Sequence, residues 1–292
     1  MHELCAPLRL TWDLPPDPAL ARDLWRRIAD GRVLFVEIRL GELSLPALEA
    51  LAASPASSPA PRVTLLAESS AILAAAESLE ARAPFGRDLL LLPPFAPGHL
   101  LLGLRRAGAN PAPALWATPS GLAAFSEALD AALALGSNAL AILNAPAPAE
   151  PLTREVRARV SSVWRARRPR GLELRVHDLF LAEELGLDAF ERYSGCQAGG
   201  ALGHLTDGGK LLACRTLPVE LGDASERSLV EIWSGPARRE LRSRLGERPE
   251  PCSPCSLAST CGGGCRGLAP GLGRDPSCTG VRRGMALGGA PP

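Results

Sequence analysis

The stretch "CSPCSLASTCGGGC", residues 252–265, places four cysteines at the spacing C-x2-C-x5-C-x3-C. Cys196, Cys214 and Cys278 frame it, so seven of the eight cysteines lie in the last third of the chain. Thiolates gathered in this way bind zinc, copper(I) or iron–sulfur clusters. Seven are too many for one structural zinc and one short of two all-cysteine zinc sites, and the unequal gaps are similar to those of cluster-binding ferredoxins. The stretch therefore predicts a metal-binding module.

Before the cysteines, short apolar runs alternate with amphipathic stretches such as "PALARDLWRRIADG", residues 18–31. Near-continuous apolar strands alternating with helices predict a parallel sheet covered by helices. Six strand–helix units can wind into a partial barrel, although the periodicity also fits an open doubly wound sheet. The strands are expected at residues 8–12, 33–38, 63–67, 88–93, 114–118, 139–143 and 172–176.

Composition excludes several classes of function. The chain has 292 residues, 46% hydrophobic residues and a formal net charge of +1, so bulk electrostatics do not favour binding to nucleic acid. No apolar run reaches the roughly 18 residues of a membrane span, and "MHELCAPLRL" does not resemble a signal peptide. We therefore expect a cytoplasmic protein without a membrane or nucleic-acid partner, in which closely spaced cysteines bind metal.

Three further features accompany the cysteines: "DGGKLLAC", a G-x4-C that ends at Cys214; "LGDASERSLVEIW", residues 221–233; and "CGGGC", residues 261–265. Together they resemble the SPASM domain, the auxiliary-cluster module at the C-terminus of many radical S-adenosylmethionine (SAM) enzymes. The resemblance covers Cys196 to Cys278. It implies an α/β fold: a partial (β/α)6 TIM-like barrel, followed by a small cysteine-rich SPASM domain made of a β-hairpin and short helices.

The resemblance also implies domain limits. We expect a degenerate radical SAM-like barrel over residues 1–177, a linker helix over 178–195 and the SPASM domain over 196–280. The Gly- and Pro-rich residues 281–292 are expected to form a disordered tail.

Two [4Fe-4S] clusters are implied by the same resemblance. The first would be held by Cys196, Cys214 and Cys265, with its fourth site either open or filled by Glu191, Tyr193 or His204. The second would be held by Cys252, Cys255, Cys261 and Cys278.

The catalytic cysteines of that family are missing. Radical SAM enzymes carry C-x3-C-x2-C after the first barrel strand, whereas this chain reads "DLPPDPALARD" over residues 13–23. Their Gly-Gly-Glu-Pro after the second strand is reduced here to Gly41-Glu42. SAM binding and radical chemistry by the isolated chain are therefore not expected. The resemblance implies a non-catalytic partner of an active radical SAM enzyme in peptide or cofactor maturation, which relays electrons or presents a peptide substrate.

Two alternatives stay open. An open iron on the first cluster could act as a Lewis acid in an enzyme of another kind. The thiolates could instead hold zinc in an interaction protein. Elsewhere, Glu37 and Arg39 are expected to pair inside the barrel, His177 is expected to be structural, and His204 and the Arg-rich helix 154–170 are expected to face solvent.

Overall fold

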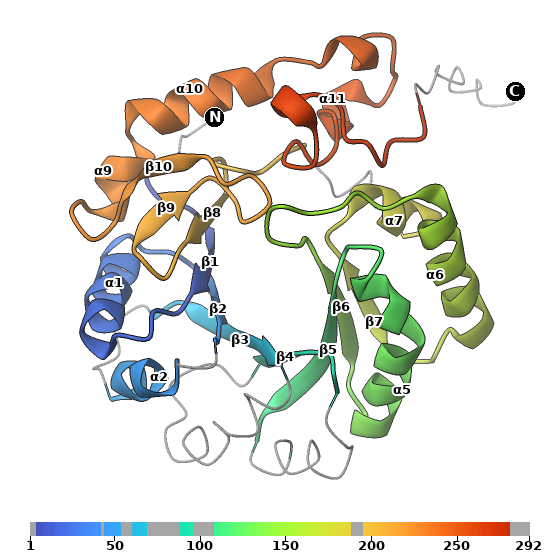
Figure 1. The fold of residues 1–292 in the computed structure, drawn as a ribbon, viewed down its shortest axis with the longest axis horizontal. Helices are drawn as coiled ribbons and strands as arrows, with labels where there is room; N and C mark the ends of the chain where they lie inside the picture. Colours follow the sequence, from blue (N-terminus) through green and yellow to red (C-terminus); the bar gives the residue numbers. More distant parts are fainter. Residues whose placement is uncertain are drawn as a thin grey trace, which may run out of the picture.

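The computed structural model describes residues 4–41, 44–53, 60–68, 88–95, 105, 108–187 and 195–280 (Figure 1). All seven expected strands are present, and each pairs in parallel with the next, which confirms the parallel sheet. They are β1 Arg9–Asp13, β2 Phe35–Arg39, β3 Arg62–Glu68, β4 Asp88–Leu92, β5 Asn110–Trp116, β6 Ala139–Leu143 and β7 Glu173–Val176.

Helices cover the outer face of this sheet (Figure 1). Helix α1 begins where the carboxylate of Asp17 accepts the N–H of Ala19 at 2.9 Å, and a proline at its first position suits that start. The helices of this part of the chain are α1 Pro18–Asp30, α2 Leu45–Ala52, η1 Gly121–Ala124, α5 Phe125–Leu135, α6 Arg154–Arg167 and α7 Leu179–Glu184. The segments between β3 and β4 and between β4 and β5, where the alternating pattern predicts two further helices, lie almost wholly outside the described residues.

Side-chain alternation separates the two faces of the barrel wall. On β1, Leu10 and Trp12 are fully buried, and Trp12 stacks on Trp25 of α1 with ring centroids 6.3 Å apart. Thr11 and Asp13 point to the opposite side, as successive residues of a strand must. The outer face of the strand thus forms the core with the helices, and its inner face carries polar groups.

The predicted hairpin is part of the barrel sheet. Strand β8 Leu202–Leu205 pairs in parallel with β1, while β9 Lys210–Leu212 and β10 Glu220–Asp223 follow it antiparallel. One ten-stranded sheet results, in the order β10-β9-β8-β1-β2-β3-β4-β5-β6-β7. Gly203 permits this contact, because a Cβ there would lie 3.2 Å from Cδ1 of Leu10.

The remaining C-terminal residues lie across one end of the barrel (Figure 1). A capping box between Ser228 and Glu231 starts α9, and Ser234 and Gly235 separate it from α10. The elements are α9 Leu229–Trp233, α10 Pro236–Gly246, η2 Glu250–Cys252, α11 Ala258–Cys261 and η3 Pro270–Leu272.

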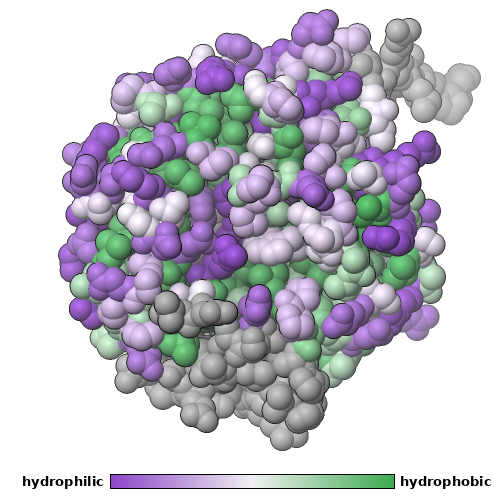
Figure 2. Space-filling view, viewed as in Figure 1, coloured by the Kyte–Doolittle hydropathy of each residue, from purple (hydrophilic) through white to green (hydrophobic). Residues whose placement is uncertain are grey.

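The surface is mixed in character. Figure 2 shows hydrophilic and hydrophobic residues interspersed over the face drawn there. In the described part of the chain, none of the helices has the length and apolar character that crossing a bilayer requires.

Candidate metal centre

Seven cysteines converge from loops and short helices of the C-terminal region, and all of them are free thiols. Cys196 precedes β8 and Cys214 follows β9, so the hairpin positions both. Four more belong to or flank η2 and α11, and the last follows η3: Cys252, Cys255, Cys261 and Cys265, then Cys278. Cys5 is exposed near the N-terminus.

Three thiols form a first group. Burial raises the pKa of Cys265 far above its usual range, and the neighbouring Cys214 and Cys196 raise it further. Burial also raises the pKa of Cys196, with Cys214 again adding to the effect. These thiols are therefore neutral without a metal, and metal ligation must deprotonate them.

Four thiols form a second group. Burial raises the pKa of Cys252, and the nearby Cys278 and Cys255 raise it further. Burial likewise raises the pKa of Cys261, with contributions from Cys278 and Cys252. The family resemblance implies one cluster for each group, and the assignment of these thiols to two clusters stays a prediction.

The thiols of each group are not collected around one point. Among the described residues, no three His, Cys, Asp or Glu side chains are placed so that they could hold a single metal ion. A tetrahedral zinc requires all its sulfur ligands about 2.3 Å from one atom, whereas a four-iron cluster sits between ligands that lie further apart.

Backbone N–H groups point at three of the sulfurs and offset part of the rise in pKa that burial causes. Cys196 receives them from Ala198 and Arg266, and Cys265 from Gly267. Cys261 receives two, from residues 263 and 264. Such donors stabilise negative charge on sulfur, which suits thiolates bound to an anionic cluster.

The triple glycine at residues 262–264 has a steric cause. All three have positive φ, and at Gly264, with φ +77°, a Cβ would lie 2.6 Å from Cβ of Asp275 and 3.0 Å from the ring of Phe180. Only glycine fits this close approach without displacing its neighbours. The glycines thus let the chain between Cys261 and Cys265 turn tightly beside the sulfurs.

Asp275 joins the two thiol groups, and the sequence interpretation missed it. Its carboxylate accepts the N–H of Cys265 and of Ser277, both at 2.8 Å, and its own N–H donates to Gly263 at 2.8 Å. Burial raises the pKa of this carboxyl group. An aspartate two residues before a serine is a known turn signal, so "DPS" could have indicated it.

Two arginines, the buried Arg266 and the half-buried Arg242, fix the backbone around the sulfurs. Arg266 donates to the carbonyl groups of Gly262, Leu245 and Glu247 at 3.2–3.3 Å. From α10, Arg242 donates to the carbonyl oxygen of Cys196 at 2.8 Å. The cysteine loops are therefore held by charge-assisted hydrogen bonds, which are stronger than those between neutral groups.

Arg215, the residue after Cys214, connects this region to the barrel. Its Nη1 donates to Oε1 of Glu37 at 2.7 Å, and its guanidinium lies 5.2 Å from the ring centroid of Trp116. The expected Glu37–Arg39 pair is therefore wrong: Glu37 binds Arg215, and Arg39 lies 3.9 Å from Asp13. The nearer cation comes from the far end of the sequence.

His204 is buried, so the expectation of a surface position is wrong. Its Nδ1 lies 2.9 Å from Oγ1 of Thr11 and its Nε2 lies 3.4 Å from Asp13, because β8 pairs with β1. The other two residues predicted for the fourth site of the first cluster, Glu191 and Tyr193, lie outside the described residues.

The barrel encloses two cavities. One of about 380 Å³ is lined by Glu37, Thr64, Asn110 and His177, and the surrounding barrel wall lowers the pKa of His177 through burial. The other, of about 410 Å³, lies at the carboxyl ends of β2 to β5 and is lined in part by Trp116. Ligand sites of parallel β/α barrels gather at that end.

Comparison with known families matches residues 196–256 to SPASM, an iron–sulfur cluster-binding domain. A comparison with curated proteins gave no match.

Solved structures resemble nearly the whole chain. SuiB of Streptococcus suis bound to S-adenosylmethionine has 18% identity and a TM-score of 0.65, with 95% of this chain and 78% of SuiB covered. SuiB bound to the precursor peptide SuiA gives 18% identity, a TM-score of 0.64, and coverage of 94% and 76%. A histidine-tagged form of anSMEcpe with bound AdoMet has 12% identity and a TM-score of 0.57, with 95% of this chain and 89% of anSMEcpe covered. The chain thus has the mixed α/β fold of these solved structures, built on a large parallel sheet, and its residues 196–256 match an iron–sulfur cluster-binding domain.

Proposed function

We propose that this chain holds two [4Fe-4S] clusters and acts as a non-catalytic partner of an active radical SAM enzyme in the cytoplasm. It relays electrons to that enzyme or presents the peptide that the enzyme modifies. The single observation that carries the proposal is the arrangement of seven thiols in two groups, next to a first barrel strand whose following loop contains no cysteine.

The donor set fits the two clusters. Buried thiols, N–H groups aimed at the sulfurs and the glycine turn at 262–264 all suit thiolate ligands of an anionic group. When bound, such clusters supply one-electron transfer. The first cluster would be held by Cys196, Cys214 and Cys265, and the second by Cys252, Cys255, Cys261 and Cys278.

The N-terminal part, residues 1–177, is proposed as a scaffold for peptide. No cysteine stands between Cys5 and Cys196, so the thiolates that hold the SAM-cleaving cluster have no counterpart. The loop after β1 is instead docked on β2, where the N–H of Leu14 donates to the carbonyl oxygen of Arg39 at 3.0 Å. Two of the similar structures contain bound peptides, SuiA and Kp18Cys, which supports a peptide as the substrate handled here.

The decisive experiment measures iron, sulfide, zinc and SAM cleavage on one anaerobic preparation. We expect a brown protein with about eight irons per chain, four for each cluster, and no 5′-deoxyadenosine on reduction. Formation of 5′-deoxyadenosine by this chain alone would refute the non-catalytic role. A colourless protein with stoichiometric zinc would refute the clusters and support the zinc alternative.

A second candidate is an enzyme that uses an open iron of the first cluster as a Lewis acid. The observation in its favour is that His204 already binds Thr11 and Asp13, which removes one of the three candidate fourth ligands. Glu191→Gln and Tyr193→Phe test the other two. An unchanged EPR spectrum of the cluster in both variants supports an open site, and a changed spectrum in either one identifies a ligand and contradicts it.

A further inference from the structure

Strand β7 forms one end of the sheet, and its outer edge is free. In the part of the chain that the structure describes, β7 pairs with β6 alone. The N–H groups of Glu173 and His177 donate to β6 or its flanking residues at 2.8 and 2.9 Å. Because backbone groups of a strand alternate in direction, the N–H and C=O groups of Leu174 and Val176 point away from β6. They have no backbone partner among the described residues.

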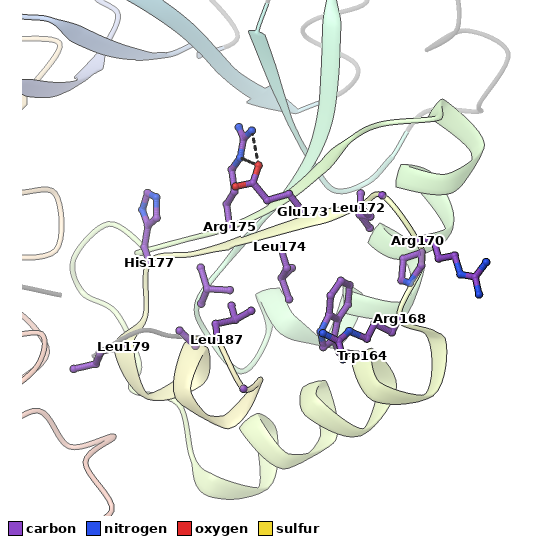
Figure 3. Close-up of a pocket in the computed structure, with 15 residues that line it drawn as sticks. Trp164, Arg168, Arg170, Leu172, Glu173, Leu174, Arg175, His177, Leu179 and Leu187 are labelled. Atoms are coloured by element: carbon purple, nitrogen blue, oxygen red, sulfur yellow. Dashed lines mark hydrogen bonds and ion pairs between the residues drawn. The ribbon is translucent and has the colours of Figure 1, made fainter. Parts of the chain in front are cut away.

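A groove of about 970 Å³ runs along this edge (Figure 3). Its described lining comes from the end of α6, the segment that leads into β7, β7 itself and α7 with the residues after it. Trp164, Leu174 and Leu187 supply apolar lining. Figure 3 shows Leu174 on the side of β7 that faces the helices, and Arg175 and His177 on the opposite side.

The groove continues into the barrel. Glu173, Arg175 and His177 line both the groove and the cavity of about 380 Å³ inside the barrel. A chain extended along β7 would therefore present alternate side chains to the apolar groove and to the polar interior.

Two cations lie at one end of the groove without an ionic partner. Arg168 and Arg170 are exposed, and neither forms an ion pair within the described ranges. Their neighbours are engaged, since Arg167 pairs with Asp130. Free guanidinium groups at the rim of a groove favour carboxylates on its occupant.

We propose that the edge of β7 binds an acidic peptide in extended conformation, which adds to the sheet as a further strand. Its backbone bonds to Leu174 and Val176, apolar side chains enter the groove beside Trp164, and its carboxylates lie near Arg168 and Arg170. The mode is β-strand addition, in which backbone bonds give affinity and alternate pockets give specificity. This inference rests on the proposed peptide-presenting role and names the class of peptide and its route into the barrel.

The test uses fluorescence anisotropy with the anaerobically purified chain and the fluorescein-labelled peptide Asp-Glu-Val-Thr-Leu-Ser-Leu-Gly. Two N-methylated versions, each blocking one alternate set of amides, serve as matched controls. Methylation of the set that faces β7 should weaken binding about tenfold or more, because two hydrogen bonds of roughly 1 kcal/mol each are lost. Methylation of the other set should leave binding within about twofold. Equal binding of all three peptides, or no binding of the parent, would overturn strand addition.

Protein variants test the site itself. Arg168→Glu with Arg170→Glu should weaken binding of the parent peptide about tenfold at low salt. Arg159→Glu should not, because Arg159 is exposed on α6 outside the groove. Val176→Pro removes an outward N–H while Val176→Thr keeps it, so the first alone should lose affinity. Equal effects of the groove and control variants would overturn the location.

The outcome is separable from that of the proposed function. Peptide binding by a chain without iron would support the groove and contradict the clusters. A chain with about eight irons that does not bind the parent peptide would support the clusters and contradict the groove as a peptide site.

Discussion

The ion pair between Glu37 and Arg215 should stabilise the contact between the barrel and the cysteine region. The Nη1–Oε1 distance is 2.7 Å, and the side chains are 14% and 5% exposed. Nε and Nη2 of Arg215 have no hydrogen-bond partner, so Glu37 is the only carboxylate that this guanidinium binds in the described chain. Glu37→Gln keeps the shape and one acceptor but removes the compensating charge.

The expected loss follows from the geometry. At 2.7 Å and an effective dielectric constant of about 20, two unit charges attract by roughly 6 kcal/mol. Desolvation offsets part of this attraction, and removal of one partner of a buried pair costs about 3–5 kcal/mol. Because glutamine still accepts a hydrogen bond, we expect Glu37→Gln to lower the free energy of unfolding by about 3 kcal/mol.

Urea unfolding under anaerobic conditions, followed by tryptophan fluorescence in variants matched for iron content, measures this loss. The control is Glu173→Gln, which breaks the pair with Arg175, whose side chains are 63% and 52% exposed. It should cost about 1 kcal/mol or less. Losses that agree within about 1 kcal/mol in the two variants would refute the reasoning.

Three further outcomes are expected. Gly264→Ala should abolish about half of the iron content, because no Cβ fits there. Gly271→Ala is the control: at φ +60° with nothing within 4 Å of a Cβ, it should cost only about 1 kcal/mol of backbone strain. Equal iron content in the two variants would contradict this prediction. Burial raises the pKa of Asp178 from 3.8 to about 6, so the folded chain binds the proton of this carboxyl group more tightly than the unfolded chain does. Protonation of Asp178 therefore adds at most about 3 kcal/mol to the free energy of unfolding. This contribution is present below about pH 4 and is lost as the pH rises through about 6. Asp178→Asn should flatten the unfolding free energy measured across that range, and an unchanged slope would disagree. Cys214→Ala should lower iron from about eight to about four per chain by colorimetric assay, while Cys5→Ala should retain all of it.

Local patterns were sufficient for the barrel wall. Apolar runs such as Ala139–Leu143 coincide with a fully buried strand, since burial on both faces leaves no polar position. The helix within residues 18–31 could be predicted from its amphipathic pattern, and in the structure it spans Pro18–Asp30. These elements depend on neighbours in sequence, which periodicity reports.

Contacts between distant segments could not be predicted in this way. Glu37 and Arg39 share a face of β2, which suggested a pair, but periodicity cannot show that Arg215 approaches from 178 residues away. His204 lies in a polar hairpin sequence, and only its pairing with β1 buries it. The assignment of the thiols to two clusters came from the family resemblance and stays a prediction, whereas the contacts of Asp275 depend on a loop packing that spacing does not encode.

The parallel pairing of β1 with β8 has a consequence for biosynthesis. Thr11 and His204 are partners in register although 193 residues separate them. During translation, at roughly 5–20 residues per second, β1 therefore leaves the ribosome well before its neighbour exists and keeps one edge unpaired for about 10–40 seconds. Such an edge can pair with another nascent chain. Cells that make this protein in quantity should need a chaperone that covers this edge until β8 is made.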